Sequence, residues 1–292
     1  MQLRTGVTRE PIGIAGGGRV GQAIGRALYD RGEPVTCVAS RTFTNAKAAA
    51  GFIGSRVEAV TYAELAVRAS RLLISVPDEA LEEVAGMIHV DSGVALHTCG
   101  ARGPDALDAL RRRGVSCGTL HPLQTFAEAA ADAGVLQGVA FAVSGEDDDE
   151  AVNWAEQIAG LVDGTVLRIE AGLRPLYHAA AVMASNYVVA LLAAAGTLME
   201  AAGVEKRAAL NALAPLVRTS VENALTLGPV QAITGPIQRG DVTTVAAHLN
   251  ALRSSSAPLQ ALYRAGGLQA LEIARQRGLP PECAMAVEKM LN

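Results

Sequence analysis

Three glycines near the N-terminus have a spacing that suits phosphate binding. Gly16, Gly18 and Gly21 follow the pattern G-x-G-x-x-G. The first glycine of this pattern permits a tight turn, the second lets the backbone approach a pyrophosphate, and the third lets the next helix pack closely on the strand. The helix N-terminus then offers free N–H groups to the phosphates. The spacing alone is not specific, because glycine-rich turns also occur in α/β proteins that bind no nucleotide.

The residues on both sides of the glycines make the pattern more specific. Residues 11–15 are a short apolar run, typical of a buried strand, and residues 19–31 repeat apolar side chains with a helical period. Strand, glycine turn and helix are the context that a dinucleotide-binding turn requires. We therefore expect the cofactor to contact a continuous stretch at the turn, namely Gly16, Gly17, Gly18, Arg19, Val20 and Gly21.

The end of the second expected strand indicates which dinucleotide is bound. An acidic residue there selects NAD through the ribose 2′-hydroxyl, whereas an arginine accommodates the 2′-phosphate of NADP. The chain has Ser40, Arg41 and Thr42 at this point, and no Asp or Glu between Thr36 and Ala50. These residues favour NADP, with Arg41 pairing with the phosphate. The alternative is that Arg41 is an ordinary surface arginine on a loop.

Further polar residues follow three other expected strands. Ligands of open α/β sheets bind outside the carboxyl ends of the strands. We expect the nicotinamide to lie against Ser75, Val76, Pro77 and Thr98, and His121 to bind substrate. A structural histidine in a proline-containing turn explains His121 equally well. Cys99 lies at the same edge, but nothing in the sequence indicates an activated thiol.

A long apolar helix expected over residues 173–202 carries three polar side chains. His178, Ser185 and Asn186 need hydrogen-bond partners or a ligand if this helix is buried. His178 and Asn186 are eight residues apart, which is about 12 Å along a helix, so they could contact two ends of one ligand. We expect His178 to donate a proton, Asn186 to orient the substrate and Ser185 to bind it. The alternative is that all three only fix helix packing.

The element pattern predicts an α/β protein in two parts. Strands alternating with helices up to residue 170 indicate a Rossmann-type, mainly parallel sheet. Only helical patterns follow, so an all-α domain is expected after the sheet. We therefore predict a dinucleotide-binding domain over residues 1–170 and a helical substrate and dimerisation domain over residues 171–292.

Composition excludes several classes of function. The 292 residues carry a net charge of −4, and the basic run at residues 111–113 is typical of a solvated helix end, so no nucleic-acid partner is expected. The four cysteines have no metal-ligand spacing, so we expect no metal site and free thiols in a cytoplasmic protein. The N-terminus has no signal-peptide pattern.

The most apolar stretch, residues 179–198, indicates whether the chain crosses a membrane and whether it forms a dimer. Polar residues interrupt it, namely Ser185, Asn186, Gly196 and Thr197, so we expect a buried helix and no membrane span. Residues 184–195 are almost all small or aliphatic. One helical domain of about 120 residues has little depth to cover such a helix. A homodimer through the helical domain is expected; the alternative is a central core helix.

Taken together, the motifs resemble a bacterial family that joins an N-terminal Rossmann-like domain to the domain of unknown function 2520. The stretches that carry the resemblance are the glycine turn at 12–21 and residues 75–78, 97–100, 121–126, 178–187 and 234–241. The resemblance implies an NADP-dependent oxidoreductase without an assigned substrate, one branch of the family resembling a ketopantoate reductase. The layout is more distantly similar to pyrroline-5-carboxylate reductases and 6-phosphogluconate-type dehydrogenases.

The chain departs from the wider group at two positions. Hydroxyacid dehydrogenases of that group place a lysine on the first helix after the nucleotide domain, but this chain's three lysines, Lys47, Lys206 and Lys289, lie elsewhere. His178 is therefore the candidate proton donor on this helix. Cys99 also stands where the family pattern has serine.

Two functions follow from these patterns. The first is an NADPH-dependent reductase of a small carbonyl compound, such as a 2-oxo acid of the ketopantoate type, or of an imine. A histidine suits the proton-donating role because its pKa lies near working pH. The second is a non-catalytic NADP(H)-binding regulator, which would bind the cofactor without turnover.

Overall fold

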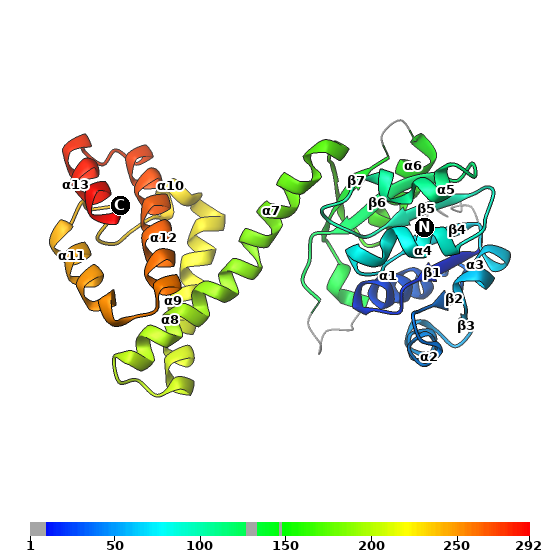
Figure 1. Ribbon diagram of the computed structural model, residues 1–292, viewed down its shortest axis with the longest axis horizontal. Coiled ribbons are helices and arrows are strands. Elements are labelled where there is room, and N and C mark those ends of the chain that lie inside the picture. The colour runs from blue at the N-terminus through cyan, green and yellow to red at the C-terminus, as the bar shows by residue number, and fades with distance from the viewer. Residues whose placement is uncertain (1–9, 127–132, 146–147) are drawn as a thin grey trace, which may run out of the picture. The chain divides into compact units, whose positions relative to one another are not determined.

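The computed structural model describes residues 10–126, 133–145 and 148–292. It divides into two compact units, Met1–Asn186 and Tyr187–Asn292, which are considered separately (Figure 1). The expected boundary near residue 170 differs from this division. Helix α7 (Arg174–Ala184) belongs to the first unit, because its Arg174 side chain is fully buried among residues of the sheet.

One eight-stranded sheet forms the first unit. Its order is β3-β2-β1-β4-β5-β6-β7-β8, and every neighbouring pair is parallel except β6 and β7. This confirms the predicted Rossmann-type, mainly parallel sheet. The strands are β1 (Ile12–Ala15), β2 (Val35–Ala39), β3 (Glu58–Val60), β4 (Arg71–Ile74), β5 (Val94–His97), β6 (Ser116–Pro122), β7 (Ala140–Ser144) and β8 (Thr165–Arg168).

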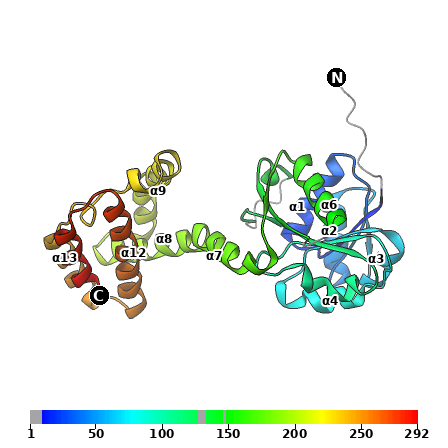
Figure 2. The same cartoon turned by 90° about the horizontal axis from the view of Figure 1, so that it is seen from above.

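Helices cover both faces of the sheet (Figure 2). One face packs against α1 (Arg19–Asp30), α2 (Phe43–Ile53) and α6 (Asp149–Leu161). The other packs against α3 (Tyr62–Arg68), α4 (Leu81–Met87) and α5 (Asp108–Arg111). Short 3-10 turns, η1 (Asp78–Ala80), η2 (Pro104–Leu107), η3 (Ala133–Leu136) and η4 (Ala171–Leu173), complete the unit.

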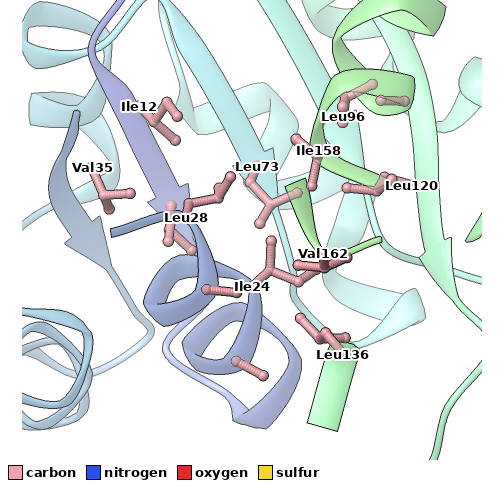
Figure 3. Close-up of a cluster of buried hydrophobic side chains, with 14 of the residues drawn as sticks. Ile12, Ile24, Leu28, Val35, Leu73, Leu96, Leu120, Leu136, Ile158 and Val162 are labelled. Carbon is pink, nitrogen blue, oxygen red and sulfur yellow. The ribbon is translucent and has the colours of Figure 1, made fainter. Parts of the chain in front are cut away.

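Alternation along the strands explains the two layers. In β4, Leu73 points into one core cluster, while Leu72 and Ile74 point into the other. Successive side chains of a strand face opposite sides, so a strand covered on both faces is apolar throughout. Figure 3 shows the first cluster, in which Ile24 and Leu28 of α1 meet Leu73.

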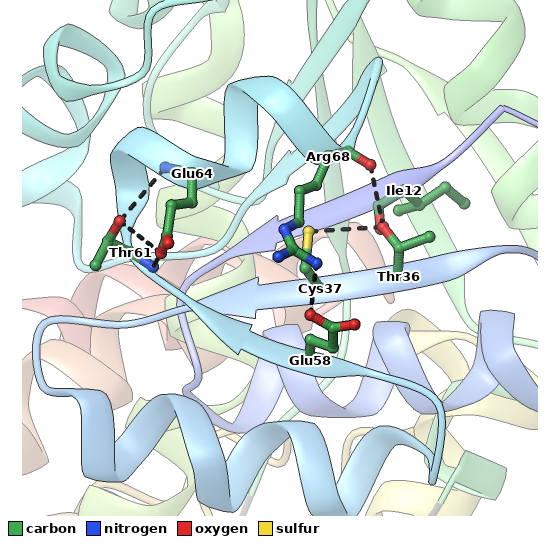
Figure 4. A network of polar contacts seen from close by, with 7 residues as sticks. All are labelled: Ile12, Thr36, Cys37, Glu58, Thr61, Glu64 and Arg68. Atoms are coloured by element: carbon green, nitrogen blue, oxygen red, sulfur yellow. Dashed lines mark hydrogen bonds and ion pairs between the residues drawn. The ribbon is translucent and has the colours of Figure 1, made fainter.

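Local capping fixes where the covering helices begin. The Thr61 hydroxyl accepts from the backbone N–H of Glu64, and the Glu64 carboxylate accepts from the N–H of Thr61, which is a capping box at the start of α3 (Figure 4). At the other end of α3, Arg68 pairs with Glu58 of β3. These contacts hold the helix that follows β3 beside the carboxyl edge of the sheet.

Within its described residues, the second unit contains helices and no strand. It contains α8 (Asn186–Ala201), α9 (Lys206–Leu227), α10 (Pro229–Ala232), α11 (Val242–Ala251), η5 (Leu252–Ser254), α12 (Ala257–Gln276) and α13 (Pro281–Leu291). Asp241 caps α11 by accepting from the backbone N–H and the hydroxyl of Thr244. The core of the unit is a single cluster formed by Val245, Leu271, Ala284, Val287 and Leu291.

The long helix expected over residues 173–202 is two helices. The backbone leaves the helical conformation at Ser185, with φ −119° and ψ −75°, between α7 and α8. The prediction of a buried helix is also wrong, because Met183, Tyr187 and Val189 are more than half exposed. By length and composition alone, the stretch Ala171–Ala201 could cross a membrane, and only 6% of its most apolar window is buried.

Candidate functional site

The glycine turn joins β1 to α1 as the sequence predicts. Gly16 has a φ of +122°, and a Cβ there would lie 2.0 Å from the carbonyl oxygen of Ser75. A Cβ at Gly21 would lie 2.3 Å from the carbonyl oxygen of Gly16. By contrast, a Cβ at Gly18 would meet no atom within 4 Å. Two glycines therefore allow close packing, and the third leaves open space in front of the helix N-terminus.

A cavity of about 540 Å³ opens beside this turn. Its predicted lining residues are Gly16, Gly17, Gly18, Ser40, Arg41, Ser75, Val76 and Pro77. The sequence analysis missed seven further lining residues, which follow β2, β3 and β4: Asn45, Tyr62, Glu79, Ala80, Glu83, Val84 and Met87. Asn45 and Tyr62 could have been found, because each stands in the first turn of the helix after its strand and so near the same edge.

Arg41 is the cation of this cavity. It is exposed and makes no hydrogen bond or ion pair with a described residue. It also lies close enough to Tyr62 to lower the pKa of that phenol, against the larger opposing effect of burial. An arginine without a carboxylate partner at the end of β2 fits the 2′-phosphate of NADP better than a bare ribose hydroxyl.

The other residues expected to contact the cofactor have local roles at the rim. The Thr42 hydroxyl caps α2 by accepting from the N–H of Asn45. The Thr98 hydroxyl donates to the Ser75 hydroxyl oxygen over 3.2 Å, which joins the ends of β4 and β5. Arg19 donates to the carbonyl oxygen of Phe126. Val20 packs on the core and Gly21 is buried.

A second cavity of about 760 Å³ lies further along the same edge, within the first unit. It brings together all four residues that the sequence assigned to substrate: His121, His178, Ser185 and Asn186. The remaining lining residues are Leu123, Gln124, Thr125, Phe126, Leu167, Tyr177, Ala180, Ala181, Val182 and Ala184. No Asp, Glu, Lys or Arg is among these described lining residues, so its polar groups are the two imidazoles and uncharged hydroxyl and amide groups.

Two histidines converge at the inner end of this cavity. The His121 and His178 rings lie edge to face, with centroids 5.8 Å apart. His121 Nδ1 is 2.8 Å from the Tyr177 hydroxyl. A Cβ at Gly100 would come within 2.4 Å of His178 Nδ1 and 2.9 Å of His121 Nε2. Only a residue without a side chain at position 100 leaves room for both imidazoles.

Arg174 supports this end of the cavity from beneath. Its fully buried guanidinium donates to the Thr119 and Ser144 hydroxyl oxygens and, over 2.8 Å, to the carbonyl oxygen of Cys99. It therefore joins β6, β7 and the loop after β5. None of these acceptors is a carboxylate, and its Nε has no hydrogen-bond partner among the described residues. A positive charge without a paired negative charge thus lies beneath the histidines.

Burial and this charge keep two imidazoles neutral. The pKa of His121 is lowered to about 4 by burial, by Arg174 and by His178. The pKa of His97 is also lowered to about 4, chiefly by burial. His97 accepts from the N–H of Cys99 at Nδ1 and lies 2.8 Å from the carbonyl oxygen of Gly103 at Nε2, so it holds the loop that contains Gly100.

The cysteines take no part in this chemistry. Burial raises the pKa of Cys99 to about 11 and that of Cys117 to about 12, so both are thiols at neutral pH. Among the described residues, no group of three or more His, Cys, Asp or Glu side chains is arranged to hold a metal ion.

Sequence reasoning missed Gly100, Arg174 and Tyr177. Tyr177 and Arg174 stand within four residues of His178 and so share its helix, but a lone arginine or tyrosine gives no signal of where its side chain lies. Gly100 follows the strand-end residues Thr98 and Cys99. Its packing could not be predicted, because the two histidines that it contacts, His121 and His178, lie 21 and 78 residues further along the chain.

Two family models match the chain and together span most of it. A Rossmann-like domain matches residues 3–122, and the domain of unknown function 2520 matches residues 139–270. The chain therefore carries a Rossmann-like domain followed by a domain of unknown function 2520, as the motifs predict. No curated protein matches it.

Solved structures share the fold over most of their length. A protein from Bacteroides fragilis, provisionally named an NADP oxidoreductase, is 22% identical with a TM-score of 0.70, covering 92% of this chain and 97% of that chain. A reductive aminase from Aspergillus terreus in complex with NADPH and ethyl-5-oxohexanoate is 18% identical with a TM-score of 0.60, covering 97% and 92%. A 1-pyrroline-5-carboxylate reductase from Streptococcus pyogenes is 18% identical with a TM-score of 0.58, covering 97% and 96%. At such identities the likeness concerns the fold.

Proposed function

We propose that the protein is an NADPH-dependent reductase of a small carbonyl compound, such as a 2-oxo acid of the ketopantoate type, or of an imine. One observation carries the proposal: the two cavities lie at the same edge of the sheet, the first after β1, β2 and β4 and the second at the end of β6, with β5 between them. The Ser75–Thr98 hydrogen bond lies between the glycine turn and the histidine pair. The fold of reductases that act on such substrates is consistent with this assignment.

The first cavity fits NADP by its own chemistry. The open backbone at Gly18 and the N-terminus of α1 suit the pyrophosphate, and Arg41 with Ser40 suits the 2′-phosphate. Ser75, Val76 and Pro77 line the part of the cavity after β4, where the nicotinamide would lie. When bound, NADPH supplies a hydride to the substrate carbon.

The second cavity supplies the proton and orients the substrate. His178 Nδ1 is buried, so Nε2 is the nitrogen that reaches the cavity. We assign Nε2 of His178 as the donor to the substrate oxygen or nitrogen. The Asn186 amide, which can both donate and accept hydrogen bonds, holds the substrate, with Ser185 and His121 as further contacts.

The test is NADPH oxidation with a panel of 2-oxo acids and cyclic imines, using the wild type and His178→Gln. Turnover should fall by about a hundredfold or more in the variant, while NADPH affinity stays the same, because a general acid contributes about that factor. His248→Gln, in the helical unit, is the matched control. A destabilised but fully active His178→Gln protein contradicts the assignment. Tight NADPH binding without turnover on any substrate would indicate the regulator instead.

Cofactor preference has a separate test in Arg41→Glu. This change removes the phosphate partner and adds repulsion, so NADPH binding should weaken by roughly ten- to a hundredfold more than NADH binding, as for loss of a charge-assisted hydrogen bond of about 1.5–3 kcal/mol. Arg56→Glu on the same unit is the control. If Arg41→Glu weakens the binding of NADPH and NADH equally, Arg41 does not bind the 2′-phosphate.

We also propose a homodimer through the helical unit. Val189, Leu216 and Leu225 are 64–80% exposed in the single chain. An apolar surface of this kind on a single chain marks an interface. A second copy of the chain would bury it, and light scattering at micromolar concentration tests this directly.

A further inference from the structure

We infer that Tyr177 is a positioning residue, which acts through His121 to fix the protonation and orientation of His178. This inference deepens the proposed function and rests on it, but its main test requires no substrate. The three side chains form a row, Tyr177–His121–His178, along the lining of the second cavity, with Arg174 beside Tyr177.

The geometry of the row places the two ring nitrogens of His121 against different partners. Nδ1 of His121 is 2.8 Å from the Tyr177 hydroxyl. Nε2 lies over Gly100, at the same point of the backbone as His178 Nδ1. Both nitrogens approach the point where a Cβ of residue 100 would lie, so the lack of a side chain at Gly100 lets the two imidazoles face one another.

The buried nitrogen of His178 needs such a partner. Its Nδ1 is inaccessible to water and makes no hydrogen bond with a described residue. Buried polar atoms in native proteins are nearly always hydrogen-bonded. His121 Nε2 converges with it on Gly100, so it is the partner that the fold provides.

The Tyr177 hydroxyl decides which way the protons of the row point. When it donates to His121 Nδ1, the ring proton of His121 must be on Nε2, where it faces His178 Nδ1 as a donor. His178 then accepts at Nδ1 and carries its own proton on Nε2. That nitrogen reaches the second cavity, so Tyr177 places a proton at the cavity end of the row.

The same row can replace the proton that His178 gives up. His178 Nε2 gives its proton to the substrate, and His178 Nδ1 takes the proton of His121 Nε2. His121 Nδ1 then takes the proton of the Tyr177 hydroxyl. Each electron pair stays with the atom that releases its proton, so the negative charge ends on the Tyr177 oxygen. Solvent then reprotonates Tyr177, which is half-buried.

Charged groups around the row favour this direction of transfer. Burial raises the pKa of Tyr177, and the Arg174 guanidinium, 6.0 Å from the Tyr177 ring and bonded only to neutral groups, opposes this rise by stabilising negative charge on Tyr177. Arg174, His178 and His97 oppose protonation of His121, and Asp78 alone favours it. His121 therefore stays neutral at pH 7 and can pass a proton on.

The first test is nitrogen NMR of the five histidines in the wild type and in Tyr177→Phe. His121→Gln and His178→Gln serve to assign the two signals. In the wild type, His121 should be neutral at pH 7 with its proton on Nε2, and His178 should accept a hydrogen bond at Nδ1 and carry a proton on Nε2. In Tyr177→Phe, His121 should lose its preference for that tautomer, and the His178 signals should shift with it.

The matched control is Tyr263→Phe, which removes a second tyrosine–histidine hydrogen bond of 2.8 Å, to His248 in the helical unit. It should leave the signals of His121 and His178 unchanged. If Tyr177→Phe also leaves both signals unchanged, or if His121 is charged at pH 7, the inference is wrong.

The second test applies to any substrate that the wild type reduces. Tyr177→Phe should lower kcat at least tenfold and change its pH profile, with KM and NADPH affinity unchanged. A lower melting temperature with full kcat would mean that Tyr177 only packs the helix, and would overturn the inference. If the wild type reduces no substrate, the proposed function fails, while the NMR result still decides the role of Tyr177.

Discussion

The two units of the molecule differ in how completely they bury their apolar residues. In the sheet unit, helices cover both faces of the sheet, and two large clusters of buried side chains result. The helical unit has a single small cluster, while Val189 and Leu225 face solvent. A sheet covered on both faces completes its core within one chain, whereas a few helices cannot cover each other all round. The sheet unit therefore completes its core by itself, whereas the helical unit leaves apolar side chains exposed.

The largest expected effect contrasts a leucine in each unit. Leu73 is fully buried in β4, so Leu73→Ala should lower the free energy of unfolding by about 2–5 kcal/mol. Leu225 is 80% exposed, so Leu225→Ala should change it by less than about 0.5 kcal/mol in the monomer. Fluorescence of Trp154, the sole tryptophan, follows the sheet unit, and circular dichroism follows both. If Leu73→Ala and Leu225→Ala lower the free energy of unfolding equally, the two units do not differ in how they bury their apolar residues.

The second-largest expected effect is a loss of folding stability at low pH that arises in the sheet unit. The pKa of buried His97 is about 4 in the folded chain, against about 6.5 when unfolded. Between these values the unfolded state binds the proton, so stability is fully present above pH 6.5 and falls as the pH drops toward 4, by about 3 kcal/mol.

His97→Gln tests this, because glutamine does not titrate and its amide can form both hydrogen bonds. In urea unfolding between pH 4 and 8, His97→Gln should lose about half of the wild type's acid-sensitive stability, because His121, whose pKa is also lowered to about 4, remains. Exposed His89→Gln is the control and should follow the wild type. An unchanged pH dependence in His97→Gln would mean that His97 is not the source.

The third effect tests the buried cation of the site. Arg174→Met leaves the Cys99 carbonyl and two hydroxyl oxygens without their donor, which should cost about 2 kcal/mol of unfolding free energy. The pKa of His121 should rise, because the positive charge beside it is gone. Arg168→Met, whose side chain is 70% exposed, should cost less than about 0.5 kcal/mol. If Arg174→Met and Arg168→Met lose the same unfolding free energy, Arg174 does not stabilise the site.

The smallest effect tests the proposed interface. Val189→Glu puts a charge on the exposed apolar face of α8 and should weaken the dimer at least tenfold, or by about 1.4 kcal/mol. Val67→Glu, on an 88% exposed position of the sheet unit, should leave the dimer intact. Sedimentation across a concentration series measures both. A wild-type monomer, or equal weakening by the two changes, would contradict the proposal.

Local sequence determined the elements and the glycine turn. The strand predicted at residues 11–15 and the helix predicted at residues 19–31 match β1 and α1 within one residue, because the apolar patterns that define them act over a few neighbouring positions. The turn at Gly16, Gly18 and Gly21 could also be predicted from neighbouring residues, because the strand and the helix that identify it lie directly before and after it. The sequence also named His121, His178, Ser185 and Asn186, which line one cavity.

Tertiary structure alone decided how those residues meet. The break at Ser185 interrupts a stretch whose composition favours one continuous helix. The convergence of His121 and His178 on Gly100, and the burial of Arg174 beneath them, join segments 21 to 78 residues apart in the chain. No local pattern encodes such contacts, because they depend on the order of strands in the sheet and on the space that each side chain leaves for its neighbours.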